Sequence, residues 1–139
     1  MPRGDQHAPA RAPRSAAEAE LVERFTRAFE SSDIDGVVAL LTEDVSFTMP
    51  PLPFEWEGRD RARLFLRAMW TTPVRRLIGT RANGQPAFAL YLPGPHGDVL
   101  HATGLLVLTL AAQQISAITR FDNSGLSSFG LPRTLPTEP

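Results

Sequence analysis

The sequence contains no cysteine and no lysine. Without cysteine, the chain has no disulfide, no thiolate nucleophile and no cysteine-ligated metal. All fourteen of its basic residues are arginines, which excludes a lysine Schiff base and the lysine of a Walker-type phosphate loop. Acid–base chemistry is therefore left to histidine, the single tyrosine and the carboxylates.

Net charge and long hydrophobic runs are also lacking. The formal net charge is -1, so no strong field steers the chain to nucleic acid or to an anionic membrane. No segment approaches a membrane span, and the N-terminus lacks the apolar core of a secretory signal. We therefore expect a cytoplasmic protein that contacts neither nucleic acid nor membrane.

Common catalytic and cofactor motifs are missing as well. The sequence has no HExxH, GxGxxG, GxSxG or phosphate-loop pattern. Its three histidines, His7, His96 and His101, are scattered rather than spaced as metal ligands. We expect no metal and no cofactor.

What is present is enough for one domain. The 139 residues are 42% hydrophobic, which allows a real core and an internal pocket. Residues 1–15 are rich in Pro, Arg and Ala and predict a disordered tail. We expect a single domain over residues 16–136 and a short tail over 137–139.

Hydrophobic spacing predicts three helices in the N-terminal half. The first begins near Ser15, the second runs from a cap at Ser32 or Asp33 towards Leu41, and the third covers residues 59–70. A strand lies between the last two helices, where Val45, Phe47 and Met49 alternate with polar residues, and a proline-rich loop follows it.

Four more strands are predicted in the C-terminal half, over residues 74–82, 85–91, 99–110 and 114–121. Asn83-Gly84 predicts a tight hairpin, residues 93–98 a turn, and residues 122–139 an irregular tail. Helices followed by an antiparallel meander indicate an α+β fold. We expect a curved antiparallel sheet that wraps three helices into a cone with one open end, a natural pocket.

Several segments together resemble a known domain. They are AFESSDIDGVVALLTEDVSFTMPPLPFEWEGRDRARLFL, AFALY, HATGLLVLTL and ITRFDNSGLSSFGLPRTLP, and they cover about residues 18–136. They resemble a C-terminal domain of some actinobacterial extracytoplasmic-function sigma factors, which is SnoaL-like and of the nuclear transport factor two-like superfamily. The 17 residues before the match are too few for the two sigma domains that bind polymerase and promoter DNA, so promoter recognition is not carried over.

The resemblance implies two classes of function. The superfamily includes ketosteroid isomerases, polyketide cyclases and epoxide-opening enzymes, which use acid–base residues at the pocket without metal. It also includes non-catalytic domains that bind ligands or proteins, and fold alone does not choose among them. The chain is either an excised domain or a stand-alone relative.

His101 and Tyr91 are the first catalytic candidates. Strand periodicity places His101 on one face with Thr103 and Leu105, and histidine exchanges protons near neutral pH. If residues 93–98 close a hairpin, Tyr91 lies near His101 and can stabilise developing negative charge. The structural alternatives are an exposed histidine and a tyrosine that covers the sheet edge.

Asp122 and Glu55 are the candidate carboxylates. Asp122 follows the last predicted strand, where it can orient His101 or act as a base, and its alternative is a turn residue. Glu55 lies in the loop after MPPLP, where the resembling domains carry an apolar or aromatic residue, and its alternative is a solvated loop carboxylate.

The substrate-binding candidates are mostly apolar. Arg120 is also included, because an arginine in a strand either pairs with an acid or holds an anionic substrate. Thr103 is included because it shares the predicted face with His101. The walls that would fold the substrate and exclude water are Phe47, Met49, Trp56, Phe65, Trp70 and Leu105.

Two functions follow from these residues. The first is a cofactor-independent isomerase or cyclase of an apolar metabolite, for example an epoxide-opening or polyketide-type ring closure. The second is a ligand-sensing or protein-docking regulatory domain. A pocket where His101 and a carboxylate converge favours the enzyme, and one lined only by apolar groups favours the second function. We also expect a homodimer through the exposed sheet face.

Overall fold

The computed structural model describes residues 15–70, 75–94 and 99–136. The predictions for the tails at 1–15 and 137–139 and for the turn at 93–98 fall mainly or wholly outside these residues. The helices are α1 (Ala16–Glu30), α2 (Ile34–Val38) and α3 (Arg59–Met69). The strands and the 3-10 helix are β1 (Leu41–Thr48), β2 (Glu55–Glu57), β3 (Arg76–Ala82), β4 (Gln85–Pro93), β5 (Val99–Ala111), β6 (Gln114–Phe121), η3 (Asn123–Phe129) and β7 (Thr134–Pro136).

The helices start where the sequence provides caps. The Ser15 hydroxyl accepts a hydrogen bond from the Glu18 N–H at 3.0 Å and begins α1. The Asp33 carboxylate accepts one from the Gly36 N–H at 2.9 Å and begins α2. α2 is shorter than predicted, because Leu41, expected near its end, is the first residue of β1.

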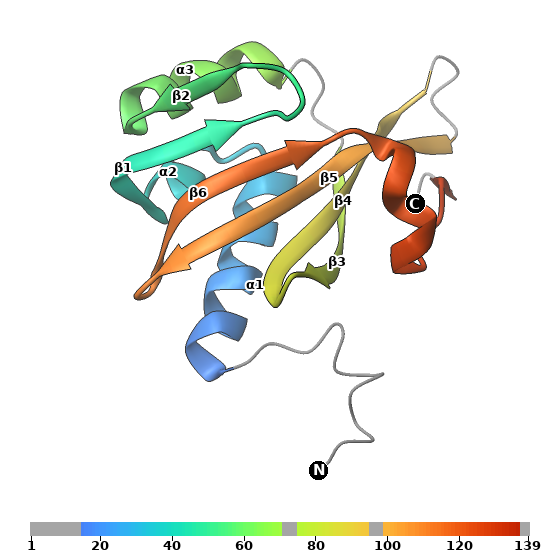
Figure 1. The fold of residues 1–139 in the computed structure, drawn as a ribbon, viewed down its shortest axis with the longest axis horizontal. Helices are drawn as coiled ribbons and strands as arrows, with labels where there is room; N and C mark the ends of the chain where they lie inside the picture. The colour runs from blue at the N-terminus through green and yellow to red at the C-terminus, as the bar shows by residue number, and fades with distance from the viewer. Residues whose placement is uncertain (1–14, 71–74, 95–98, 137–139) are drawn as a thin grey trace.

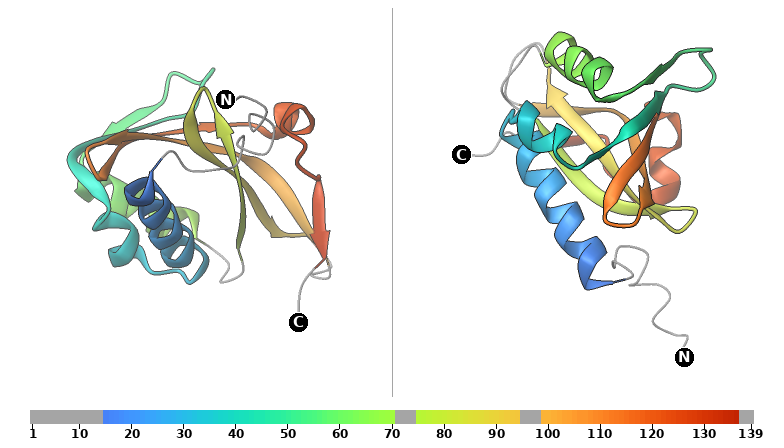
Figure 2. Two further views of the ribbon diagram at one scale, coloured as in Figure 1. Left: turned by 90° about the horizontal axis from the view of Figure 1, so that it is seen from below. Right: turned by 90° about the vertical axis from the view of Figure 1, so that its left-hand side faces the viewer.

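One curved sheet wraps the helices. Its strand order is β2-β1-β6-β5-β4-β3, with β7 paired to β5, and all pairs are antiparallel except β1 with β6. Figure 1 shows α1 and α2 behind the long strands, and Figure 2 shows the sheet curving around them. The predicted α+β class, with a curved sheet around N-terminal helices, is confirmed. The hairpin at Asn83 and Gly84 is also confirmed, both residues having positive φ.

Side chains pack on both faces of the sheet. The inner cluster fills the space between helices and sheet and includes Phe25, Phe29, Leu66, Leu106 and Leu108. The outer cluster lies on the opposite face and includes Tyr91, Leu100, Leu105, Leu126 and Leu131. Figure 2 shows η3 and β7 on the side of the sheet away from the helices.

The outer cluster includes part of the last segment of the resemblance, ITRFDNSGLSSFGLPRTLP. Its leucines Leu131 and Leu135 pack in the outer cluster, and Leu135 pairs with Leu100 of β5. Residues 123–136 therefore form a C-terminal cap over one end of the sheet. The prediction of an irregular tail over this region is wrong, because η3 and β7 are anchored by these contacts.

A β-bulge in β5 changes which residues share a face. Leu90 pairs with Gly104 and Tyr91 with Ala102, so Thr103 has no partner on β4. Strict alternation predicted one face for His101, Thr103 and Leu105. That prediction is wrong, because the extra residue reverses the alternation between His101 and Leu105.

Candidate functional site

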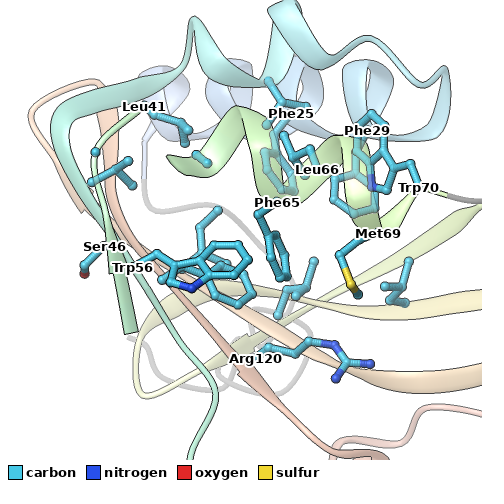
Figure 3. Close-up of a pocket in the computed structure, with 18 residues that line it drawn as sticks. Phe25, Phe29, Leu41, Ser46, Trp56, Phe65, Leu66, Met69, Trp70 and Arg120 are labelled. Atoms are coloured by element: carbon cyan, nitrogen blue, oxygen red, sulfur yellow. The ribbon is translucent and has the colours of Figure 1, made fainter. Parts of the chain in front are cut away.

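An apolar cavity lies between the helices and the inner face of the sheet. Its walls come from the three helices and from β1, β2, β4, β5 and β6, and its volume is about 70 Å³. Figure 3 shows the side chains converging from these elements. The aromatic lining residues are Phe25, Phe29, Phe47, Trp56, Phe65 and Trp70.

Rings pack against one another along two walls of the cavity. The Phe65 ring centre lies 4.4 Å from that of Phe47 and 4.1 Å from that of Trp56. On the other wall, the ring of Phe29 meets that of Trp70 edge to face at 5.0 Å. Such pairs add to the area that they bury, so they fix the shape of an apolar wall.

Apart from the two indoles, the polar side chains that line this cavity among the described residues are those of Ser46 and Arg120. Figure 3 shows the Ser46 hydroxyl directed away from the other labelled residues and the Arg120 guanidinium below Met69. The Arg120 Nη2 donates to the Thr103 carbonyl at 2.9 Å. Its Nε is buried and has no hydrogen-bond partner in the structure.

The missing side chain of Gly104 makes room for Arg120. A Cβ at Gly104 would lie 3.2 Å from the Arg120 Cζ and 2.6 Å from the Phe121 carbonyl oxygen. The bulge also leaves the Thr103 carbonyl available to Arg120. The local backbone of β5 therefore positions the one charged group in the described part of the cavity lining.

The structure does not bring Tyr91 and His101 together. Tyr91 pairs with Ala102 and is fully buried in the outer cluster, whereas His101 pairs with Leu92, which packs on the inner cluster. The Tyr91 hydroxyl donates to the Pro132 carbonyl at 2.6 Å, and burial raises the pKa of this phenol. The predicted pairing of these two side chains is wrong, because the β4–β5 register sends them to opposite faces.

His101 is exposed near the C-terminal cap. It pairs with Thr134 of β7 and lines a shallow hollow with Asn123 and Arg133. It does not line the apolar cavity.

The two candidate carboxylates are also outside the cavity. The Asp122 side chain accepts hydrogen bonds from the Ser124 N–H and hydroxyl at 2.9 and 2.6 Å, and so caps η3. These hydrogen bonds, with a smaller Coulombic contribution from Arg120, lower the pKa of Asp122. Glu55 is exposed on β2, a strand that the sequence analysis placed in a loop. Neither residue lines the cavity.

The predicted substrate-binding residues divide into two groups. Five of them line the cavity, namely Phe47, Trp56, Phe65, Trp70 and Arg120. Met49, Thr103 and Leu105 are not in the cavity lining. Leu105 faces the outer side because of the bulge, and Thr103 contributes its carbonyl to Arg120 rather than its side chain to the cavity.

A wider groove lies on the outer face of the sheet. Its volume is about 640 Å³, and it is lined in part by Leu105, Val107, Phe121 and Asp122. Because it is more open and more polar, it lacks the enclosure that retains a small apolar ligand. We therefore take the inner cavity as the candidate ligand site.

Comparison with known proteins fits this architecture. A family model for the SnoaL-like domain matches residues 22–118. The chain belongs to the SnoaL-like domain family. The resemblance found in the sequence is thereby confirmed at the level of the family.

A curated relative of this SnoaL-like domain is the extracytoplasmic-function RNA polymerase sigma factor SigG of Mycobacterium tuberculosis. The two are 35% identical over 128 residues, which are 89% of this chain and 34% of the sigma factor. The chain thus spans about a third of the length of the curated relatives it matches.

Solved structures share the fold of the SnoaL-like domain at low sequence identity. A candidate polyketide cyclase from Xanthomonas campestris pv. campestris is 22% identical, with a TM-score of 0.57 over 81% of this chain and 93% of that chain. The epoxide hydrolase/cyclase-like enzyme SalBIII, of pyran ring formation in salinomycin, is 21% identical, with a TM-score of 0.59 over 76% of this chain and 90% of that chain. These similarities show the fold.

The described residues show neither a metal-binding cluster nor a membrane-spanning helix. They contain no group of three or more His, Cys, Asp or Glu side chains that could hold a metal ion. None of their helices is long and apolar enough to cross a membrane.

Sequence reasoning missed part of the cavity wall. Phe25 and Phe29 were predicted on one face of the first helix, and Leu106 on a strand, but none was assigned to a pocket. Periodicity identifies residues that face inward. It does not say which inward residues pack fully and which border a space.

Proposed function

We propose that this SnoaL-like domain is a small-molecule-binding module with a regulatory role. The observation that carries the proposal is the chemistry of the inner cavity. Its described lining includes six aromatic side chains and no carboxylate, imidazole or phenol. A wall of this kind supports binding of an apolar ligand and supplies no acid–base pair for proton transfer.

The size of the cavity supports a small ligand. A cavity of about 150 Å³ holds benzene in another protein, and sites for drug-sized ligands measure about 300–1,000 Å³. The inner cavity, at about 70 Å³, is smaller than either. A six-carbon chain is larger than benzene, so its binding requires α3 to move away from the sheet, and a polyketide requires a larger movement.

The regulatory part of the proposal is supported by the relatives. In the sigma factor SigG, the region that matches this chain is about a third of the protein. We propose that ligand occupancy changes how this domain contacts a partner, either in the same chain or in another one.

Intrinsic fluorescence tests the binding proposal directly. Trp56 and Trp70 are the only tryptophans, and both line the cavity. Titration with 1-hexanol should change the tryptophan emission and saturate. Ala62→Phe fills the cavity and should abolish the saturable change, whereas the matched Ala68→Phe, at an exposed position of α3, should not. Saturation that is equal in both variants would contradict the proposal.

A second candidate function is a cofactor-independent isomerase or cyclase. It is supported by the Arg120 guanidinium in an apolar cavity, which can stabilise an oxyanion that develops on a carbonyl or epoxide. Turnover of epoxide and β-keto compounds by the wild type, His101→Ala and Arg120→Gln tests it. No turnover is expected from the binding proposal. Turnover that depends on His101 would instead support the acid–base role predicted from the sequence.

A further inference from the structure

We propose that the ligand of the inner cavity is a carboxylate with a short apolar body, held at its charged end by Arg120. This inference rests on the proposed ligand-binding function and adds the chemical class of the ligand. It follows from four features of Arg120: its place in the cavity wall, its unused donors, its lack of an acidic partner and its fixed position.

Arg120 has hydrogen-bonding capacity that the protein leaves unused. A guanidinium carries five N–H donors. In the described part of the chain, the only hydrogen bond from this side chain is the 2.9 Å bond from Nη2 to the Thr103 carbonyl. The Nε is buried without a partner. The guanidinium therefore has donors left for a ligand oxygen that enters the cavity.

The charge of Arg120 is also not neutralised by a contact. No carboxylate among the described residues lies within 4.0 Å of its guanidinium nitrogens. Asp122 is close enough for its pKa to be lowered by Arg120, but its carboxylate is hydrogen-bonded to Ser124 and exposed. A cation beside an apolar space favours a singly charged anion, which loses less hydration energy on entry than a dianion does. A carboxylate matches the guanidinium fork with two parallel hydrogen bonds.

Another buried arginine, Arg75, uses more of its donors than Arg120 does, although its Nε is likewise buried without a partner. Arg75 is 4% exposed, and both of its terminal nitrogens donate to the Ser32 hydroxyl, at 2.8 and 2.7 Å. Its Cζ also lies 4.2 Å from the ring centre of Trp70, a cation–π contact. Arg120 has no such set of contacts and borders the cavity.

The backbone holds Arg120 in place for this role. The bulge at Thr103 presents the carbonyl that receives Nη2, and Gly104 leaves the space in which Cζ lies. A guanidinium that is fixed before binding loses less side-chain freedom when the ligand arrives. A carboxylate is favoured over a phosphate ester. Arg120 is the one basic residue in the described lining, and a single positive charge does not balance a dianion.

Matched ligand pairs test the inference. Tryptophan emission is titrated with straight-chain carboxylates of four to ten carbons and with the alcohols of the same lengths. The wild type should bind the best carboxylate at least about tenfold more tightly than its alcohol, as expected for charge-assisted hydrogen bonds. Arg120→Gln, which keeps a donor for the Thr103 carbonyl, should remove this preference, and Arg120→Met should do the same. Arg24→Gln, which removes an exposed arginine on α1, should retain it.

The outcomes separate this inference from the proposed function. Equal affinity for acid and alcohol, or a preference that survives in Arg120→Gln, would overturn the inference and leave ligand binding intact. Tighter, Arg120-dependent binding of hexyl phosphate than of hexanoate would overturn the choice of a carboxylate. If neither acids nor alcohols produce a saturable change, the proposed function itself fails.

Discussion

The hydroxyl of Tyr91 gives a quantitative test of its structural role. The side chain is fully buried, and its hydroxyl donates to the Pro132 carbonyl at 2.6 Å. Tyr91→Phe removes this hydrogen bond and keeps the ring. Because Pro132 is exposed, its carbonyl regains water, so the loss is close to the net value of one hydrogen bond, about 1 kcal/mol. The melting temperature should fall by roughly 3–5 °C.

Urea denaturation measures this loss, with two reference variants. Tyr91→Ala also removes the ring from the outer cluster and should reduce the free energy of unfolding by about 3–5 kcal/mol. Thr134→Val removes an exposed hydroxyl from β7 and should change it by less than about 0.5 kcal/mol. If Tyr91→Phe is as stable as Thr134→Val, the hydrogen bond does not anchor the C-terminal cap, and the structural assignment of Tyr91 is wrong.

Three further predictions follow from contacts in the fold. Burial raises the pKa of Tyr91, so this group adds stability that is complete below pH about 10 and is lost as the pH rises through the folded-state pKa. Tyr91 is the single tyrosine, so an absorbance titration of the folded protein should have a higher midpoint than one in urea. Equal midpoints would refute this prediction. Gly104→Ala should destabilise the fold by about 2 kcal/mol and weaken hexanoate binding, because the new Cβ would lie 2.6 Å from the Phe121 carbonyl oxygen and 3.2 Å from the Arg120 Cζ. Gly79→Ala, with open space around it, should do neither. Urea denaturation compares the stability of the two variants, and fluorescence titration compares their binding. Glu18→Gln should reduce the free energy of unfolding by about 3 kcal/mol, because its ion pair with Arg81 is only about one-tenth exposed. Glu23→Gln breaks the exposed pair with Arg27 and should reduce the free energy of unfolding by less than about 0.5 kcal/mol. Similar losses in urea denaturation of the two variants would contradict the burial argument.

Most of the fold could be predicted from the sequence, because local signals and periodicity agree along most of the chain. Ser15 caps the first helix, Asn83-Gly84 closes a hairpin, and the strand predicted over residues 114–121 is β6 as observed. The short strand β2 could not be predicted, since its three residues are ordered by pairing with β1 rather than by a pattern of their own. The C-terminal cap was missed for the same reason, because it depends on contacts with β5.

The candidate site was predicted only in part. Phe47 and Trp56 line the cavity as expected, Phe47 from the alternation along its strand and Trp56 from the resemblance to the family rather than from the local pattern. The placement of His101, Tyr91 and Leu105 depended on alternation along β4 and β5. One bulge residue, Thr103, reverses that alternation, and no residue type in the sequence marks it. A one-residue irregularity is therefore enough to separate His101 from Tyr91, which the sequence predicted to act together.

The central claim is that the inner cavity, and not the outer groove, binds the ligand. Methyl NMR spectra recorded during a titration with hexanoate test this directly, because leucine, isoleucine and valine methyls line both spaces. The account predicts saturable shifts for Leu90, Leu106 and Ile118, which line the cavity, with Leu105 and Val107 on the outer groove unchanged. Shifts confined to Leu105 and Val107, or no saturable shift at any of these methyls, would contradict it.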